Sequence, residues 1–211
     1  MKSPRAHKTP IKTWIDEART ALIEEGIGGV KVDRLAARLH VSRGGFYHNF
    51  ADREALLSAL IDCWHGQCRF LPRLPDNLSA GQAVSWIEQA VTRTIEEDGY
   101  DSRFDMAVRE WARSDERTAA AVRASDKDRL DTLHRFFVML GHEPQEARIR
   151  ANTFYYHQIG YYAIGVKNSV GARMKEAGTY LKILCGQRAL EAARAEGALA
   201  PSRHRVSLVE H

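Results

Sequence analysis

Apolar residues recur along this chain at intervals of three and four positions, the repeat that gives an α-helix one apolar face. The repeat is clearest at Ile11, Ile15, Ala18 and Leu22, and again at Leu57, Leu60, Ile61 and Trp64. Long runs of alternating apolar and polar residues, which a half-buried strand requires, are missing from the sequence. The sequence therefore predicts an all-α protein.

Glycine and proline divide this helical pattern into segments. Gly26 ends the first segment, two short helical blocks follow near 32–39 and 43–49, and Asp52 is placed to cap the next helix. The segment 71–81, which contains two prolines, breaks the pattern again. Longer helices are then expected near 80–97, 101–113, 116–140, 144–166 and 172–196.

The surplus of positive charge is confined to the N-terminal quarter of the chain. Residues 1–53 contain ten Lys and Arg against six Asp and Glu, whereas the remainder contains 21 of each sign. A basic module joined to a neutral one is typical of attraction to the phosphate backbone of nucleic acid. Charge alone does not distinguish this interpretation from a chance asymmetry.

The most specific stretch is 32–50, VDRLAARLHVSRGGFYHNF. Its first half gives one short helix an apolar face, and its second half begins with two glycines and ends in aromatic residues. Phe46 and Phe50 are four positions apart and can anchor the second helix. Two short helices joined by a turn of about three or four residues match the helix-turn-helix, whose second helix enters the major groove of DNA.

The second short helix carries residues suited to contact DNA. Gly44 and Gly45 lack side chains and allow close approach, and Arg43 can read guanine or bind a phosphate. Tyr47, Asn49 and Arg53 can donate hydrogen bonds to phosphates and fix the register. The complete expected DNA-binding set is Ser42, Arg43, Gly44, Gly45, Tyr47, His48, Asn49 and Arg53.

The alternative for this stretch is a helical hairpin whose glycines end helices and whose aromatic residues only pack. Two glycines at the start of a helix disfavour that alternative, because each costs roughly 1 kcal/mol in helix propensity.

At these positions the chain resembles a known family. Residues 11–61 look like the N-terminal DNA-binding domain of the TetR family of transcriptional regulators. The matching landmarks are Trp14, Ile15 and Ala18 in the first helix, Gly26 at its end, Leu35 and Ala36 in the second, Val41 and Ser42 in the turn, Gly44, Phe46, Tyr47 and Phe50 in the third, and 54–57 at the start of the fourth. The rest of the chain matches the family only in length and all-helical layout.

The resemblance implies a homodimer that binds double-stranded operator DNA and a repressor that a small-molecule effector releases. We therefore expect a helix-turn-helix domain with a basic arm over 1–53, a helical ligand-binding and dimerisation domain over 54–200, and a polar tail over 201–211.

Four residues depart from the usual family pattern. Lys31 stands where a capping Ser or Thr is usual, and His40 replaces a glycine in the turn. Gly45 replaces a common Thr, and Asn49 replaces a common His or Tyr. Because Gly45 has no side chain, the base sequence that the third helix reads is not predicted.

The helices near 144–166 and 172–196 carry more apolar surface than one core face needs. Such helices are central in their own core or shared with a partner. The family resemblance favours a four-helix dimer interface, and two ordinary core helices explain the periodicity equally well. The expected interface residues are Tyr155, Ile159, Tyr162, Val166, Ala177, Leu181 and Leu184.

Aromatic residues are frequent in the expected C-terminal domain, where the family carries an effector pocket. A few polar groups among apolar walls commonly orient a ligand, although such aromatic sets are more often plain core. The candidate ligand-binding residues are Trp64, Trp86, Met106, Arg109, Phe137, Tyr155 and His157.

Sequence motifs for catalysis, metals and cofactors are missing. The His and Cys residues have no metal-ligand spacing, and we find no Gly-x-Ser-x-Gly, phosphate-binding loop or dinucleotide motif. We therefore expect no enzyme, cofactor or metal site, with a small helical enzyme and a helical protein-binding adaptor as the alternatives.

The sequence also predicts where the protein acts. It has no apolar stretch of about 18 residues for a membrane span, and its basic N-terminus lacks the apolar core of a secretion signal. Cys63, Cys68 and Cys185 form no Cys-x-x-Cys pair and fit reduced thiols in a cytoplasm, while a redox role for them stays open.

Overall fold

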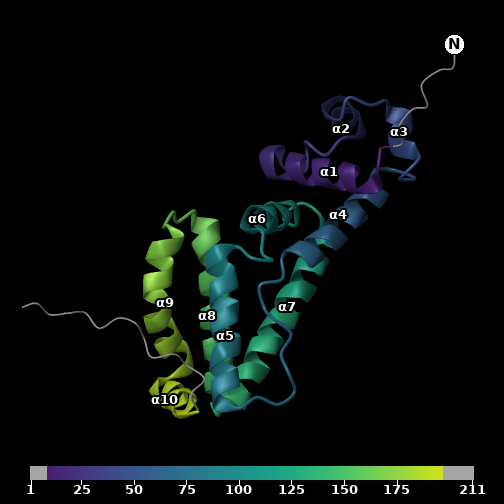
Figure 1. The fold of residues 1–211 in the computed structure, drawn as a ribbon. Coiled ribbons are helices and arrows are strands. Elements are labelled where there is room, and N and C mark those ends of the chain that lie inside the picture. The colour runs from purple at the N-terminus through teal and green to yellow at the C-terminus, as the bar shows by residue number, and fades with distance from the viewer. Residues whose placement is uncertain (1–8, 197–211) are drawn as a thin grey trace, which may run out of the picture. The chain divides into compact units, whose positions relative to one another are not determined.

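In the computed structural model, the described residues, 9–196, form α-helices joined by short connections, and the predicted all-α fold is confirmed (Figure 1). The helices are α1 (Ile11–Glu25), α2 (Val32–Arg38), α3 (Arg43–Tyr47), α4 (Arg53–Gln67), α5 (Ala80–Glu96), α6 (Ser102–Trp111), α7 (Glu116–Met139), α8 (Pro144–Ile164), α9 (Val170–Cys185) and α10 (Gln187–Ala195). The predicted tail 201–211 and the first eight residues of the predicted basic arm lie outside the described residues.

The predicted helix near 172–196 is wrong, because the chain breaks there into α9 and α10. Gly186 separates the two with a positive φ of 81°, a conformation that glycine adopts without steric cost. Gly171, the residue just before the predicted start of this helix, lies within α9. The preceding break falls at Gly165, which ends α8 with a φ of 76°.

The described chain divides into two compact units. One contains the residues up to Arg69 together with Gly99–Asp126, and the other contains Phe70–Asp98 and the residues from Lys127 onward. The predicted boundary between residues 53 and 54 separates a DNA-binding domain from a ligand-binding and dimerisation domain. This functional division stays a prediction.

The first unit is built around α1, which contacts α2, α4 and α6. Trp14 is fully buried, and its ring meets Phe46 of α3 edge-on with centroids 5.4 Å apart. Phe50 stacks on Phe46 at 5.3 Å, so the predicted anchoring pair does hold α3 to the core. Asp52 accepts a hydrogen bond from the Ala55 N–H at 2.8 Å and caps α4 as expected.

A buried polar network joins α4, α6 and α7 within this unit. Asp105 is fully buried and accepts hydrogen bonds from Trp64 Nε1 at 2.8 Å, the Tyr100 hydroxyl at 3.0 Å and Arg109 Nε at 2.9 Å. Arg109 also binds Asp126 through two further N–H groups at 2.7 and 3.0 Å. Satisfied networks of this kind fix the relative positions of the elements that carry them.

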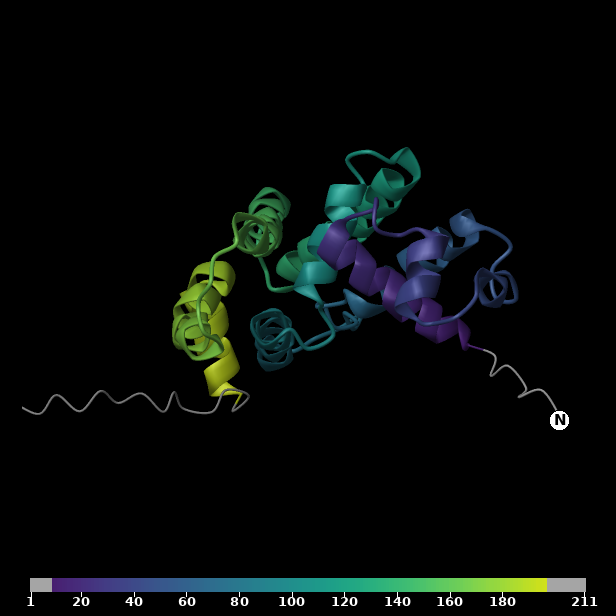
Figure 2. The ribbon, with the colours of Figure 1, turned by 90° about the horizontal axis from the view of Figure 1, so that it is seen from above.

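In the second unit α9 packs on α5, and α10 packs on both α5 and α9 (Figures 1 and 2). Aromatic residues fill its core. Trp86 stacks on Phe136 at 4.7 Å, and Phe70 stacks on Tyr155 at 6.2 Å. These large rings account for much of the buried apolar area.

Candidate nucleic-acid interface and ligand cavities

The turn between α2 and α3 is tight and is made by an unusual residue. His40 has a φ of 55°, the left-handed region that glycine favours, and the Val41 N–H returns to the Ala36 carbonyl at 3.0 Å. The position where the sequence lacks the usual glycine therefore still adopts a glycine-like conformation.

α3 presents one exposed polar face. Phe46 points into the core, whereas Tyr47 is 54% exposed. The residues of this exposed face, called here the α3 face, are Ser42, Arg43, Gly44, Tyr47 and His48. Ser42 occupies the N-cap position of α3, but its side chain makes no capping hydrogen bond.

The two glycines of α3 have different surroundings. A Cβ added at Gly44 would meet only the Ser42 Oγ, at an ordinary 3.6 Å. A Cβ added at Gly45 would lie 3.8 Å from the ring of buried Trp14. Gly44 therefore keeps the exposed face flat, while Gly45 faces the core.

Two of the predicted DNA contacts have partners on the protein backbone. Asn49 donates from Nδ2 to the carbonyls of Thr9 and Gly45, each at 3.1 Å. Arg53 donates from Nε to the Val30 carbonyl at 2.7 Å. These hydrogen bonds hold the module together, and the roles of Asn49 and Arg53 as phosphate donors stay predictions.

Arg43 remains available at the surface. Its Nε lies 2.7 Å from Asp33 Oδ1, and both side chains are largely exposed. An exposed ion pair of this kind is worth at most about 1 kcal/mol, so it can give way to a stronger anion.

The predicted ligand residues do not gather at one cavity. Trp64 and Arg109 belong to the buried Asp105 network. Trp86, Phe137 and Tyr155 are core residues of the second unit. Met106 and His157 each border a cavity, and the two cavities lie in different units.

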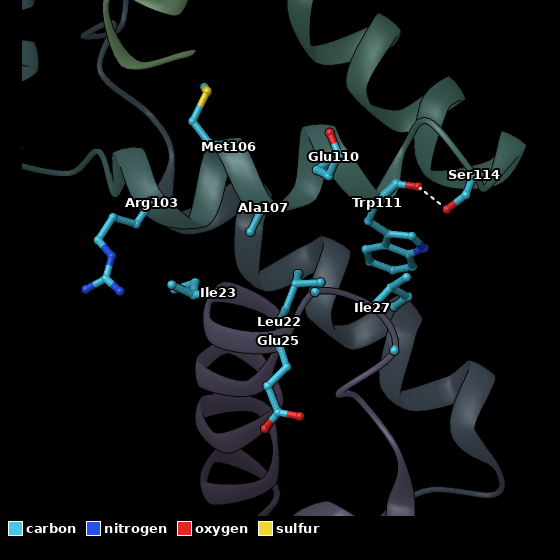
Figure 3. Close-up of a pocket in the computed structure, with 12 residues that line it drawn as sticks. Leu22, Ile23, Glu25, Ile27, Arg103, Met106, Ala107, Glu110, Trp111 and Ser114 are labelled. Carbon is cyan, nitrogen blue, oxygen red and sulfur yellow. Dashed lines mark hydrogen bonds between the residues drawn. The ribbon is translucent and has the colours of Figure 1, made fainter. Parts of the chain in front are cut away.

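The cavity of the first unit lies between α1 and α6 and measures about 620 Å³ (Figure 3). Leu22 and Ile23 of α1 and Trp111 of α6 line it, and Figure 3 shows Met106 extending from α6 on the side away from Leu22. This cavity is not the aromatic pocket that the sequence suggested, because of the named set it contains Met106 alone.

The cavity of the second unit lies between α5, α8 and α9 and measures about 550 Å³. His157 is the predicted ligand residue on its wall. Gln158, Arg173 and Tyr180 also line it, and the sequence interpretation missed them. The available signal was the i, i+7 spacing of Arg173 and Tyr180, which places two polar side chains on one face of α9.

Three of the expected dimer residues are buried within the single chain. Tyr155, Leu181 and Leu184 are 1%, 6% and 1% exposed within their own subunit, so they offer almost no surface to a second copy. Val166 is exposed, and Ile159, Tyr162 and Ala177 are half-buried. The exposed large apolar residues on α8 and α9 are Ile149, Tyr156, Ile164, Val170, Met174 and Ile183.

The cysteine thiols are shielded. Burial raises the pKa of Cys63, and it raises the pKa of Cys185 to about 12. Cys68 is buried and donates to the Asp101 carbonyl at 3.5 Å. Reactive thiols are those whose pKa is lowered toward the thiolate, so this geometry favours packing roles for Cys63 and Cys185.

Within 9–196, His, Cys, Asp and Glu residues form no cluster of three that could hold a metal ion. A separate search of the same residues finds no helix with the length and apolar character needed to cross a bilayer.

The fold and the α3 face define a helix-turn-helix protein with a helical C-terminal part. Residues 15–60 match the model of the bacterial regulatory proteins of the tetR family. The Transposon Tn10 TetC protein of Escherichia coli is 33% identical over 52 residues, which cover 25% of this chain and 26% of that protein. The match thus spans about a quarter of the curated relative. The N-terminal part of the chain is thus similar to the DNA-binding domain of the tetR family.

Solved structures share the fold over nearly the whole chain. A TetR-like transcriptional regulator from Rhodococcus sp. RHA1 has a TM-score of 0.60 at 15% identity, covering 88% of this chain and 100% of its own. AibR in complex with isovaleryl coenzyme A and operator DNA has a TM-score of 0.60 at 18% identity, covering 82% of this chain and 96% of its own. At these identities the likeness establishes the fold.

Proposed function

We propose that this protein is a sequence-specific DNA-binding transcriptional regulator that reads its operator with the α3 face. The observation that carries the proposal is the division of α3 into two sides. Phe46 anchors the helix to the core, and a flat polar surface around Gly44 and Tyr47 faces outward. A short helix with this division, following a tight turn, is the geometry that enters the major groove.

The regulator acts as a homodimer. The exposed apolar side chains of α8 and α9, including Tyr156 and Ile164, support a shared face on these helices. Two α3 faces related by the dimer axis then contact half-sites about one helical turn apart, or a multiple of it. The operator is therefore near-palindromic.

A small molecule controls DNA binding, and the protein represses in the cytoplasm until that effector binds. The effector acts by favouring one separation of the two α3 faces, and a coupling of roughly 1–3 kcal/mol is sufficient. The cavities of about 620 and 550 Å³ support this part of the proposal, because both fall in the size range of small-molecule sites.

Selection of bound sequences from random duplex DNA tests this function. We expect enrichment of a near-palindromic site. On that site Arg43→Ala costs roughly 1–3 kcal/mol and relaxes specificity at one position, because Arg43 reads a base. Arg113→Ala is the matched control, since Arg113 is an exposed arginine beyond α6 with its own ion pair to Glu110.

Failure to enrich any sequence, with DNA binding equally weak on all duplexes, contradicts the proposed function. Equal loss of affinity in Arg43→Ala and Arg113→Ala shows that Arg43 contributes only non-specific electrostatic attraction to DNA. That result contradicts base reading by Arg43.

A further inference from the structure

Arg43, the expected base-reading residue of the α3 face, contacts the protein through one nitrogen of its guanidinium group. Its Nε lies 2.7 Å from Oδ1 of Asp33 in α2, and the Arg43 side chain is 63% exposed. Among residues 9–196, the terminal nitrogens Nη1 and Nη2 have no hydrogen-bond or ion-pair partner. The pair therefore leaves both terminal nitrogens available to an acceptor from outside the chain.

The helix that carries Asp33 is firmly held. Leu35 and Ala36 bury the apolar side of α2, and α2 contacts both α1 and α3. Arg38 of α2 pairs with three carboxylates of α1, those of Glu17, Glu24 and Glu25. Asp33 is thus a carboxylate on a fixed helix, against which a flexible arginine side chain can be oriented.

The ion pair of Arg43 stands apart from the others of this module by its place. Six of the seven Lys and Arg residues in the described range 9–53 pair with a carboxylate. Of these six cations, Arg43 is the one that belongs to the α3 face. Its pair with Asp33 is largely exposed, and exposed pairs contribute little to folding stability. Its consequence is therefore expected in the reading of DNA.

Guanine suits an arginine that is held in this way. The major-groove edge of guanine presents two acceptors, O6 and N7, which a guanidinium meets with two N–H groups at once. A contact through Nη1 and Nη2 is compatible with a carboxylate at Nε, because the two interactions use different nitrogens. An arginine that is oriented before DNA arrives also loses less side-chain freedom on binding.

We propose that Asp33 is a positioning residue that orients Arg43 toward one guanine in each half-site of the operator. The Asp33 carboxylate holds Nε, and Nη1 and Nη2 donate to O6 and N7. Asp33 thereby raises discrimination at that base pair, while its negative charge lowers affinity for the phosphates of every sequence. The proposal rests on the proposed function, because it requires that Arg43 reads a base.

Fluorescence anisotropy on three duplexes tests the proposal. They are the selected operator, a variant in which the guanine sensitive to Arg43→Ala is replaced by adenine, and a random sequence. The discrimination ratio is the Kd on the variant divided by the Kd on the operator. Asp33→Asn lowers this ratio about tenfold, because Arg43 is no longer oriented. The same substitution tightens binding to random DNA by up to about fivefold, because a negative charge is removed near the phosphates.

Asp16→Asn is the matched control, since it removes an exposed carboxylate from an ion pair with Lys12 in α1. It makes the same change in charge and leaves the discrimination ratio as in wild type. Asp33→Glu keeps the carboxylate and retains the ratio within about threefold. In an Arg43→Ala background, Asp33→Asn changes the ratio no further, because the carboxylate acts through Arg43.

A merely structural role of Asp33 predicts a different result. Asp33 lies in the first turn of α2, where a negative charge favours the helix. If that were its main role, Asp33→Asn would lower the unfolding temperature and weaken binding to operator and random DNA alike. Uniform weakening of this kind overturns the proposal.

Two further results also overturn it. One is a wild-type discrimination ratio in Asp33→Asn, and the other is a loss of equal size when Arg43 is already alanine. Failure of the site selection to enrich any sequence overturns the proposed function and this inference together. An enriched operator whose reading depends on Arg43 and not on Asp33 overturns this inference alone.

Discussion

His40 has a left-handed backbone conformation at the turn that sets the angle between α2 and α3. For a residue with a Cβ this conformation costs roughly 1–2 kcal/mol, whereas glycine adopts it freely. We expect His40→Gly to raise the free energy of unfolding by up to about 1 kcal/mol, because part of the gain is lost to the more flexible unfolded chain. Urea denaturation measures the change.

His40→Ala is the control for that substitution, since it removes the imidazole and keeps the Cβ. It should leave stability unchanged within about 0.5 kcal/mol. Equal stabilisation by glycine and alanine would assign the effect to the imidazole and would contradict backbone strain at this turn.

Asp105 of α6 carries a carboxylate that is fully buried. Asp105→Ala removes the acceptor of three hydrogen bonds and leaves Arg109 half-satisfied, so we expect a loss of roughly 3–5 kcal/mol in stability. Asp131→Ala breaks the exposed pair with Lys127 and should cost less than about 1 kcal/mol. Similar losses in the two variants, measured by thermal unfolding, would show that the buried network contributes little.

At the scale of elements, Gly186 determines where α9 ends and α10 begins. A Cβ at this position meets nothing closer than the His142 ring at 3.8 Å, so any cost of substitution comes from its φ of 81°. Gly186→Ala should therefore destabilise the protein by about 1 kcal/mol.

Gly66→Ala is the matched test within a helix. Gly66 lies inside α4, and a Cβ there has open space around it. We expect a gain of up to about 1 kcal/mol, because alanine is the better helix former. If both substitutions stabilised the protein, the break at Gly186 would be dispensable and α9 would extend into α10.

Helix positions were largely predictable from the sequence, and side-chain partners were not. The three- and four-residue repeat marks α1 and α4 because it reports burial along one helix. The backbone partners of Asn49 and Arg53 were not predicted, because Thr9 and Val30 lie 40 and 23 positions away. Spacing within one helix does not reveal which backbone carbonyls the fold brings to its surface.

At the scale of the whole molecule, the sequence pattern reveals that α8 has two apolar faces. It does not reveal which face is buried in the protein's own core and which is exposed. Tyr155 and Tyr156 are adjacent aromatic residues, yet one is 1% and the other 58% exposed. Periodicity finds two apolar faces without stating which one the chain covers itself. The ligand residues were scattered for a similar reason, because aromatic content predicts burial and does not specify a cavity.

The exposed face of α8 predicts how the dimer can be broken. Tyr156→Glu should yield folded monomers, because a charge would be buried at the interface while the protomer core is untouched. Leu181→Glu should instead unfold the protein, since Leu181 lies in the core. Val138→Glu, at an exposed position of α7, should remain dimeric. Sedimentation equilibrium and circular dichroism together check these outcomes, and a dimeric Tyr156→Glu would contradict this interface.

The central claim is that the α3 face enters the groove of DNA, and Gly44→Leu tests it most directly. Binding of the selected operator duplex is measured for wild type and variant by fluorescence anisotropy, with thermal unfolding of each protein alongside. Because a side chain at Gly44 projects from the exposed side of α3, we predict that operator binding is abolished while the unfolding temperature stays unchanged. Operator affinity equal to that of wild type in a folded Gly44→Leu protein would contradict the account.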